Sequence, residues 1–278
     1  MLGEDNLITA SLVLYNSNLN DLDNVLQSVL NSNIDKLFII DNSPSNQLES
    51  HIASYNSDRI IYCYGHGNIG FGRANNIGIN RAIALGSKYH IILNPDIIFK
   101  ANVISELEDY MSSHLEVGLM LPRVEYPNGS LQYLCKLLPT PIDIFGRRFL
   151  PKKWMRRRNG RYEMHFFGYD KLWNCPILSG CFMFIRTSVL KDVGMFDDKF
   201  FMYFEDFDLM RRIHVKYKTL FYPFVSIIHN HAAEHRTNKK LLIESIKSAI
   251  IYFNKWGWFY DSDRKRINQK ALYNNLTP

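Results

Sequence analysis

The chain has 278 residues, of which 46% are hydrophobic and 14% aromatic, so it can bury one large core or two small ones and is no disordered or fibrous protein. Its formal net charge of +6 favours an anionic partner, such as a nucleotide, a lipid headgroup or a nucleic acid. Its four cysteines lack C-x-x-C spacing and are too sparse for a small disulfide-framed secreted domain, so we expect reduced thiols, mainly in the core.

The N-terminus carries acids where a secretory signal needs positive charge. No apolar run approaches the ~18 residues of a membrane span. The sequence therefore predicts a protein that is kept in the cytoplasm.

Residues 7–121 alternate between short apolar runs and amphipathic stretches, which is typical of a parallel sheet flanked by helices. Four apolar runs predict strands, at 7–15, 36–40, 59–64 and 89–93. Apolar residues with helical spacing predict a helix over 22–30. The polar segments "DNSPSN", "GHGNIG" and "NPD" follow the last three strands. Because ligands bind beyond the carboxyl ends of such strands, these three loops predict one site.

Beyond residue 121 the pattern changes, and "VEYPNGSLQY" predicts a hairpin with an Asn-Gly turn. Residues 144–162 hold eight basic residues and no acid. This segment is either a solvated loop or, because Phe149 and Trp154 lie among the charges, a surface for an anionic membrane. Further elements are expected in order: a strand at 176–185, a helix in the second half of 196–213, a strand pair around 219–223 and 225–229, and a helix at 239–253.

Gly65, Gly67 and Gly70 have the G-x-G-x-x-G spacing of dinucleotide folds. They follow the third predicted strand, whereas a true fingerprint occupies the first βα turn, so an NAD-dependent oxidoreductase is disfavoured. The loop can still bring backbone amides to a phosphate at a helix start, with Arg73 as a bidentate contact. The alternative is a tight turn that needs positive φ.

Three polar residues end predicted strands. Asp41 could accept the imide N–H of a uracil or thymine, or cap a turn. Asp96 could hold Mg²⁺ together with substrate phosphates, or cap a helix. His229 could join Asp96 as a metal or phosphate contact, or be a core histidine. The stretch "HAAEH" at 231–235 also matches the H-x-x-E-H pattern of inverted zinc proteases, but nothing upstream supplies a protease-like frame.

Glu205 and Asp206 lie about 100° apart on the predicted helix, so only one of them can face a substrate. Aromatic neighbours desolvate such a carboxylate, which raises its pKa and favours a base near neutral pH. The alternative is a set of helix N-terminal acids, with Asp208 and Arg212 as a surface i,i+4 pair.

With these motifs in this order along the chain, the sequence resembles an inverting glycosyltransferase of family 2 with the GT-A fold. It is most similar to the rhamnosyltransferases that build bacterial surface polysaccharides. The likeness is carried by "LVLYNS", "IIDNSP", "NIGFGRANNIGINRA", "LNPD", the block from 178 to 212 and "IIHNHAAEH". The resemblance implies an α/β fold with a mostly parallel central sheet flanked by helices. It implies a catalytic domain over 1–235, with a nucleotide-binding half (1–121) and an acceptor-binding half (122–235), and a C-terminal helical extension over 236–278.

The resemblance also assigns roles to residues. Asp206, paired with Glu205, would be the catalytic base, and Asp96 with His229 would hold Mg²⁺ or Mn²⁺. Asn94 departs from many relatives, which carry a first acid there, and this places metal dependence in question. The nucleotide and diphosphate contacts would be Tyr15, Asn16, Asp41, Asn68, Gly70, Arg73, Asn76 and Asn94.

The implied reaction transfers L-rhamnose from dTDP-L-rhamnose to an oligosaccharide on a polyprenyl diphosphate, as in O-antigen synthesis. Alternatives are a UDP-sugar donor (galactofuranose, glucose or N-acetylglucosamine) and a non-catalytic nucleotide-sugar or membrane-binding module. The acceptor implies peripheral association with the inner face of the cell membrane, with segments 145–161 and 255–266 as candidate contacts. No nucleic-acid partner is expected.

Overall fold

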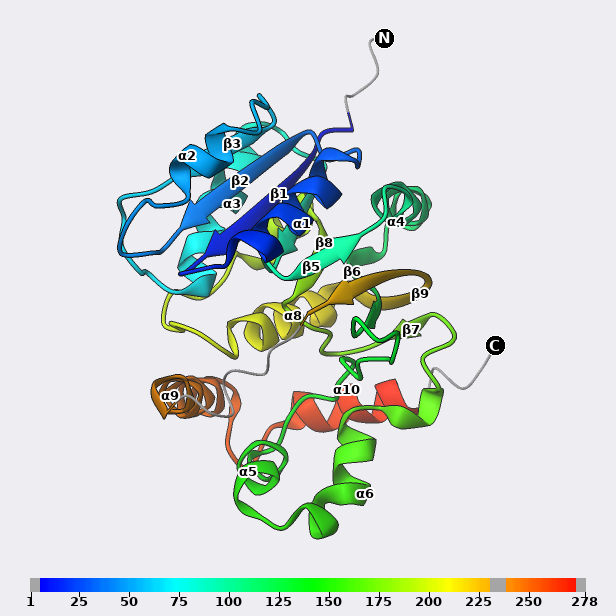
Figure 1. Ribbon diagram of the computed structural model, residues 1–278. Helices are drawn as coiled ribbons and strands as arrows, with labels where there is room; N and C mark the ends of the chain where they lie inside the picture. The colour runs from blue at the N-terminus through cyan, green and yellow to red at the C-terminus, as the bar shows by residue number, and fades with distance from the viewer. Residues whose placement is uncertain (1–5, 231–238, 274–278) are drawn as a thin grey trace.

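The computed structural model describes residues 6–230 and 239–273, and a nine-stranded sheet forms its centre (Figure 1). The strands are β1 (Ile8–Leu14), β2 (Lys36–Asp41), β3 (Ile60–Cys63), β4 (Tyr89–Leu93), β5 (Ile97–Phe99), β6 (Val117–Glu125), β7 (Trp173–Asn174), β8 (Phe182–Arg186) and β9 (Lys218–His229). Their order is β3-β2-β1-β4-β8-β6-β9-β5, with β7 paired to β9.

Ten α-helices and two short η segments are described in these ranges. They are α1 (Leu19–Leu30), α2 (Glu49–Ala53), α3 (Phe71–Ala84), α4 (Asn102–Ser113), η1 (Ile142–Gly146), α5 (Arg147–Phe149), α6 (Lys152–Tyr162), η2 (His165–Phe167), α7 (Thr187–Val193), α8 (Glu205–Lys216), α9 (Lys239–Trp256) and α10 (Ser262–Tyr273). The helix α1 forms as its pattern predicts: Asn18 caps it by accepting from the amide of Asp21 at 2.8 Å, and its apolar residues Leu22, Val25, Leu26 and Val29 are buried.

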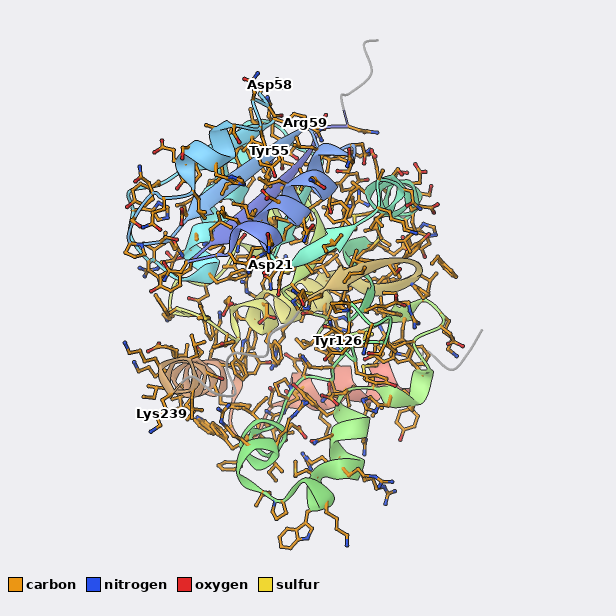
Figure 2. The ribbon with its side chains drawn as sticks, viewed as in Figure 1. Asp21, Tyr55, Asp58, Arg59, Tyr126 and Lys239 are labelled. Carbon is orange, nitrogen blue, oxygen red and sulfur yellow. The ribbon has the colours of Figure 1, made fainter. Side chains whose placement is uncertain are left out.

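The four strands predicted for the N-terminal half are confirmed, and β3, β2, β1 and β4 pair in parallel. Every residue of β1 is buried, as expected for a central strand with helices on both faces. At the end of the molecule far from α5 and α6, Arg59 donates to the carbonyls of Leu30 and Ser32, each at 2.9 Å (Figure 2). The cysteines are free thiols, three of them buried, as expected.

The strand pair expected over 219–229 is wrong, because β9 is one long strand. It pairs in parallel with β6, and the register shifts between Pro122 and Arg123, whose partners on β9 are Tyr222 and Ser226. The residues between these partners bulge from the ladder and include Pro223, which has no amide to donate. β8 runs antiparallel between β4 and β6.

Of the two interpretations of the basic segment, the solvated loop is wrong, because residues 142–149 and 152–162 form η1, α5 and α6. Two of the charges are paired: Arg158 Nε lies 2.6 Å from Asp143 Oδ1, and Arg147 pairs with Glu163. Met155 of α6 is buried, so the segment folds by packing a few apolar side chains despite its charge.

The C-terminal helices pack against the rest of the chain. Arg211 of α8 makes two hydrogen bonds of 2.8 Å to Asp261, between α9 and α10, and the indole of Trp256 donates to Asp208 at 2.8 Å. In Figure 1, α9 and α10 lie on the side of α8 that faces α5 and α6. Among the described residues, none of the helices combines the length and apolar character needed to cross a bilayer.

Candidate active site

Two of the three predicted loops meet at the carboxyl ends of β2 and β3. Asn42 donates from Nδ2 to the carbonyl of Gly70 at 3.3 Å, and its Oδ1 lies 3.0 Å from Nε2 of His66. The amide of Asn16, a residue with φ of 49°, donates to Oγ of Ser43 at 2.9 Å, so the segment after β1 joins them. The end of the parallel sheet therefore collects the polar side chains, as expected.

Asp41 ends β2 and is fully buried. One carboxylate oxygen accepts from the amide of Ser43 at 2.9 Å, and the other accepts from the hydroxyl of Tyr62 at 2.6 Å. Burial and the Asp41 carboxylate raise the pKa of Tyr62, which keeps this hydroxyl a donor. Each carboxylate oxygen keeps a second lone pair, but the side chain has no exposed surface, so its bond to a pyrimidine imide stays a prediction. Tyr15, 52% exposed, lies one strand away.

The glycine loop is built against a remote segment of the chain. Gly70 has a φ of 88°, and a Cβ there would lie 2.2 Å from the carbonyl oxygen of Phe201. The next amide, of Phe71 at the start of α3, donates to that same carbonyl at 2.9 Å, and the amide of Gly70 donates to Oδ1 of Asn68 at 3.1 Å. Gly70 is therefore required for close backbone packing, and its contact with the donor diphosphate stays a prediction.

Replacing Gly70 by Ala is expected to destabilise the fold by about 2–4 kcal/mol, because left-handed backbone strain adds to overlap with a carbonyl that cannot rotate away. The matched control is Gly67→Ala, which has a φ of 66° and open space around the added methyl group. Its cost should be only the strain, about 1–2 kcal/mol. Urea unfolding of both variants measures the difference, and equal costs would contradict the packing role of Gly70.

Arg73 and Asn76 of α3 also face this remote segment. Asn76 exchanges two hydrogen bonds with the backbone of Phe196, at 3.0 and 3.1 Å. Arg73 donates from Nε to the carbonyl of Asp198 at 3.2 Å and remains half exposed. These bonds tie α3 to the segment before α8, and the contacts to the diphosphate predicted for both residues stay predictions.

The structure brings Asp96 and His229 together. Asp96 follows β4, the strand β5 begins at the next residue, and Ile97 pairs with His229 across the ladder between β5 and β9. His229 Nε2 lies 3.4 Å from Asp96 Oδ2, and its Nδ1 lies 3.0 Å from Oε1 of Gln132. Burial opposes the imidazolium, but Cys181 and Asp96 favour it and raise the pKa of His229 to about 10.

The Asp96 carboxylate suits a divalent cation, and His229 could join it only by giving up its proton, because an imidazolium has no free lone pair. Mg²⁺ is commonly held by one or two protein groups together with substrate phosphates. Asp96 keeps 21% of its side chain exposed, which leaves it accessible from the sheet end. Groups of three or more His, Cys, Asp or Glu side chains arranged for a metal are absent from the described residues, so phosphate oxygens would have to complete the coordination. The "HAAEH" stretch lies outside the described residues.

The helix α8 begins from a strained turn. Tyr203 and Phe204 have φ values of 69° and 65°, a left-handed conformation that is rare for aromatic residues. Phe204 stays in place because it packs on Phe207 and Tyr252, with ring centroids 5.1 and 5.5 Å away. Such strain persists where the surroundings fix it, and it is common at active sites.

Glu205 and Asp206 point in different directions, as their helical spacing predicts. Asp206 is partly buried, and its carboxylate accepts from the amides of Gly180 at 3.2 Å and Phe207 at 2.9 Å. Glu205 is buried beside Gly72, and its Oε2 has no hydrogen-bond partner within the described part of the chain. Burial and the neighbouring Asp206 raise the pKa of Glu205 well above its usual range, which favours the neutral form of this side chain.

The segment 179–181 joins the two halves of the site. The amide of Gly180 holds Asp206, and the carbonyl of Cys181 accepts from the amide of Asn94 at 2.9 Å. Cys181 also interacts with His229. The predicted base and the predicted metal ligands therefore flank the same three residues, as a single reaction centre requires.

The sequence interpretation missed Lys136, whose ammonium lies 5.4 Å from the ring centroid of Phe207. A signal was present, because Lys136 is an isolated charge within the apolar run "LCKLLP". The interpretation of Asp208 as a surface residue is wrong: Asp208 is buried and accepts from Trp256 as well as from Arg212, at 2.8 and 2.9 Å.

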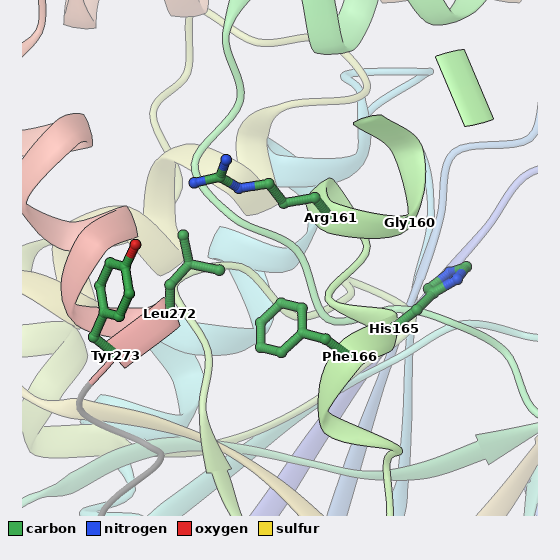
Figure 3. Close-up of a pocket in the computed structure, with 6 residues that line it drawn as sticks. All are labelled: Gly160, Arg161, His165, Phe166, Leu272 and Tyr273. Carbon is green, nitrogen blue, oxygen red and sulfur yellow. The ribbon is translucent and has the colours of Figure 1, made fainter. Parts of the chain in front are cut away.

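A second feature lies away from these residues. An open pocket of about 590 Å³ lies between the end of α6, η2 and the end of α10 (Figure 3). Its lining residues are Gly160, Arg161, His165, Phe166, Leu272 and Tyr273. They include none of the predicted site residues, so this pocket is not the reaction centre.

Residues 11–194 match the family described as glycosyl transferase family 2. An N-acetylglucosaminyl-diphospho-decaprenol L-rhamnosyltransferase of Mycobacterium tuberculosis is 28% identical over 193 residues, which are 62% of this chain and 58% of that protein. The low-salt glycan biosynthesis hexosyltransferase Agl10 of Haloferax volcanii is 27% identical over 184 residues, 65% of this chain and 54% of that protein. The chain thus spans less than two thirds of either relative.

Two solved structures share the fold at low identity. GalNAc-T7 with UDP, GalNAc and Mn²⁺ matches with a TM-score of 0.66 and 16% identity, over 90% of this chain and 48% of that one. The mannosyltransferase PcManGT from Pyrobaculum calidifontis, in complex with GDP-Man and Mn²⁺, matches with a TM-score of 0.61 and 15% identity, over 97% and 70%. The family match covers more than half of the chain but ends before Asp206 and His229. The fold is GT-A, as the sequence predicts, and the chain is a glycosyltransferase that belongs to glycosyl transferase family 2.

Proposed function

We propose that this chain is an inverting transferase that moves L-rhamnose from dTDP-L-rhamnose to a lipid-linked oligosaccharide, with Asp206 as the base. The observation that carries the proposal is that the segment 179–181 contacts both groups of residues. The amide of Gly180 donates to Asp206, and Cys181 contacts Asn94 and interacts with His229, the neighbour of Asp96. The rhamnosyltransferase named among the relatives supports the sugar and the type of acceptor.

The donor would lie with its pyrimidine at Asp41 and Tyr15 and its diphosphate near Asp96. Both uracil and thymine present an imide N–H, so Asp41 accommodates either base and the UDP-sugar alternative remains. Asn16, Asn68 and the neighbouring Asn94 would add polar contacts along the nucleotide. A bound Mg²⁺ or Mn²⁺, held by Asp96 and His229, would supply charge neutralisation for the departing diphosphate.

The chemistry is a single displacement. The acceptor hydroxyl gives its proton to the Asp206 carboxylate as its oxygen forms a bond to the anomeric carbon. The bond from that carbon to the diphosphate oxygen breaks, and its electron pair leaves with the diphosphate. Attack opposite the leaving group inverts the carbon, through an oxocarbenium-like state.

Ligand-induced stabilisation tests the donor and the cation site together. With Mn²⁺, dTDP-L-rhamnose at about 100 times its Kd should stabilise the protein by roughly 2.7 kcal/mol. Asp96→Ala should lose the part of this gain that depends on Mn²⁺, and Asp58→Ala, at a fully solvated surface position, should keep it. Thermal unfolding with dTDP-, UDP- and GDP-sugars, with and without Mn²⁺, measures both. Stabilisation by UDP-sugars alone would identify the alternative donor class, and donor binding without product from any acceptor would identify a non-catalytic module.

The lipid-linked acceptor places the enzyme at the inner face of the cell membrane, and the end formed by η1, α5 and α6 suits that surface. Trp154 is 75% exposed among basic residues, and Phe259 and Tyr260 in the loop after α9 are 92% and 87% exposed. Phe145 of η1 stacks on Trp258 of that loop, with ring centroids 6.1 Å apart, so the two segments form one surface. Exposed aromatic rings among cations favour an anionic interface.

Vesicle sedimentation tests this surface. The protein should bind phosphatidylglycerol vesicles more tightly than phosphatidylcholine vesicles, and 0.5 M NaCl should weaken the binding. Arg156→Ser with Arg157→Ser should lower the affinity roughly tenfold or more, since each charge near the surface contributes about 1 kcal/mol. The control, Lys216→Ser with Lys218→Ser, removes two charges elsewhere and should bind like the wild type. Equal loss in both variants would show that net charge, and not this surface, causes the binding.

A further inference from the structure

Lys136 lies beside the proposed base although nothing in the mechanism uses it. Its backbone pairs with Ile177, with hydrogen bonds of 2.7 and 3.1 Å, which places it next to the segment 179–181. Its side chain is partly buried, and the ammonium lies over the ring of Phe207. The amide of Phe207 holds Oδ1 of Asp206 at 2.9 Å. Lys136 and Asp206 therefore share one small region of low polarity.

The titratable groups around this region come from five segments of the chain. Asp206 is faced by Lys136 and by its neighbour Glu205. Lys136 is faced by Asp206, Cys181, and the ion pair of Arg147 with Glu163. Because Arg147 is already paired with Glu163, Lys136 is the cation placed to balance the charge of Asp206.

The two charges support each other against burial. Burial raises the pKa of Asp206, whereas the Lys136 ammonium and the amides of Phe207 and Gly180 lower it. Burial likewise lowers the pKa of Lys136, and the Asp206 carboxylate opposes this. A carboxylate in such a site would take up a proton at higher pH if the cation were removed.

We propose that Lys136 is a positioning residue that keeps the Asp206 carboxylate ionised and ready to accept the proton of the acceptor hydroxyl. The inference rests on the proposed role of Asp206 as the base. It assigns a function to a residue outside the nucleotide, metal and membrane sites. As a positioning residue, Lys136 acts through Asp206 and does not itself contact the reacting atoms.

The test is the pH profile of kcat/KM for Lys136→Met. Its acidic limb should move up by about one pH unit or more, with about tenfold lower activity on the acidic side, and the rate should recover toward that of the wild type at high pH. Lys136→Arg keeps the charge and should keep the limb near its original place. Lys218→Met, which removes an exposed lysine paired with Glu116, is the matched control and should not move the limb.

Three outcomes overturn the inference: a limb that does not move in Lys136→Met, a uniform loss of rate at every pH, and a higher KM for the acceptor at every pH. Lys136→Gln is the second neutral variant if Met impairs folding, as judged by thermal unfolding. Asp206→Asn in the same assay separates the two proposals. Normal turnover in that variant removes the proposed base itself, whereas an inactive Asp206→Asn with an unmoved limb in Lys136→Met removes only the role of Lys136.

Discussion

Replacing Asp206 by Asn is expected to lower the transfer rate by about 10²–10⁴, the usual contribution of a general base. The amide has nearly the shape of the carboxylate, and one of its two groups can still accept from Gly180 or Phe207, so the fold should persist. Asp206 lies across the segment 179–181 from Asp96, so donor binding should be unchanged. Initial rates with saturating donor, together with donor-induced stabilisation, separate the two effects.

The transfer rate is expected to change with pH in a defined direction. Burial raises the pKa of Asp206, and the base works only when ionised, so the rate should fall as the pH drops through a value above that of an ordinary aspartate. Glu205→Gln should retain turnover within a few fold, because burial already favours the neutral form of Glu205. A complete loss in Glu205→Gln with full activity in Asp206→Asn would reverse the two assignments.

An element can be predicted from the sequence when the residue pattern that determines it lies within the element itself. β1, β4 and α1 follow from apolar runs and helical spacing, since one element buries one continuous face. Two segments are mispredicted because remote partners decide them. β9 continues past Pro223 because β6 accepts a bulge there, and the basic segment becomes helical because it packs apolar residues such as Tyr162 against the core.

The same distinction holds for the site. Asp41 and His229 end strands and Asp96 follows β4, and parallel strands bring their carboxyl ends together, so their grouping could be predicted. The carbonyl of Phe201 that packs on Gly70, and the ammonium of Lys136 over Phe207, come from segments far away in the sequence. No spacing rule connects residues whose contact depends on the path of two intervening loops.

The position of the proposed base also depends on residues beyond the family match. α8 carries Asp206 at its first turn and Arg211 one and a half turns later, where the guanidinium forks onto Asp261. The guanidinium also lies over the ring of Trp256, 4.1 Å from its centroid. The side chains of Arg211 and Asp261 are 2% and 3% exposed, so this ion pair is removed from water. The C-terminal helices therefore fix the position of α8, which carries the proposed base.

Arg211→Met is expected to destabilise the protein by about 3–5 kcal/mol, because it leaves the Asp261 carboxylate buried without its partner. Arg266→Met, which breaks an exposed ion pair with Asp263, should cost less than about 1 kcal/mol and is the matched control. Burial opposes ionisation of Asp261, but Arg211 and Arg264 lower its pKa, so the advantage of the wild type should shrink as the pH falls through that lowered value. Replacing both partners, as Arg211→Met with Asp261→Asn, should recover part of the loss. Urea unfolding at pH 7 and at lower pH measures these differences, and near-equal costs for Arg211→Met and Arg266→Met would mean that the C-terminal helices do not hold α8.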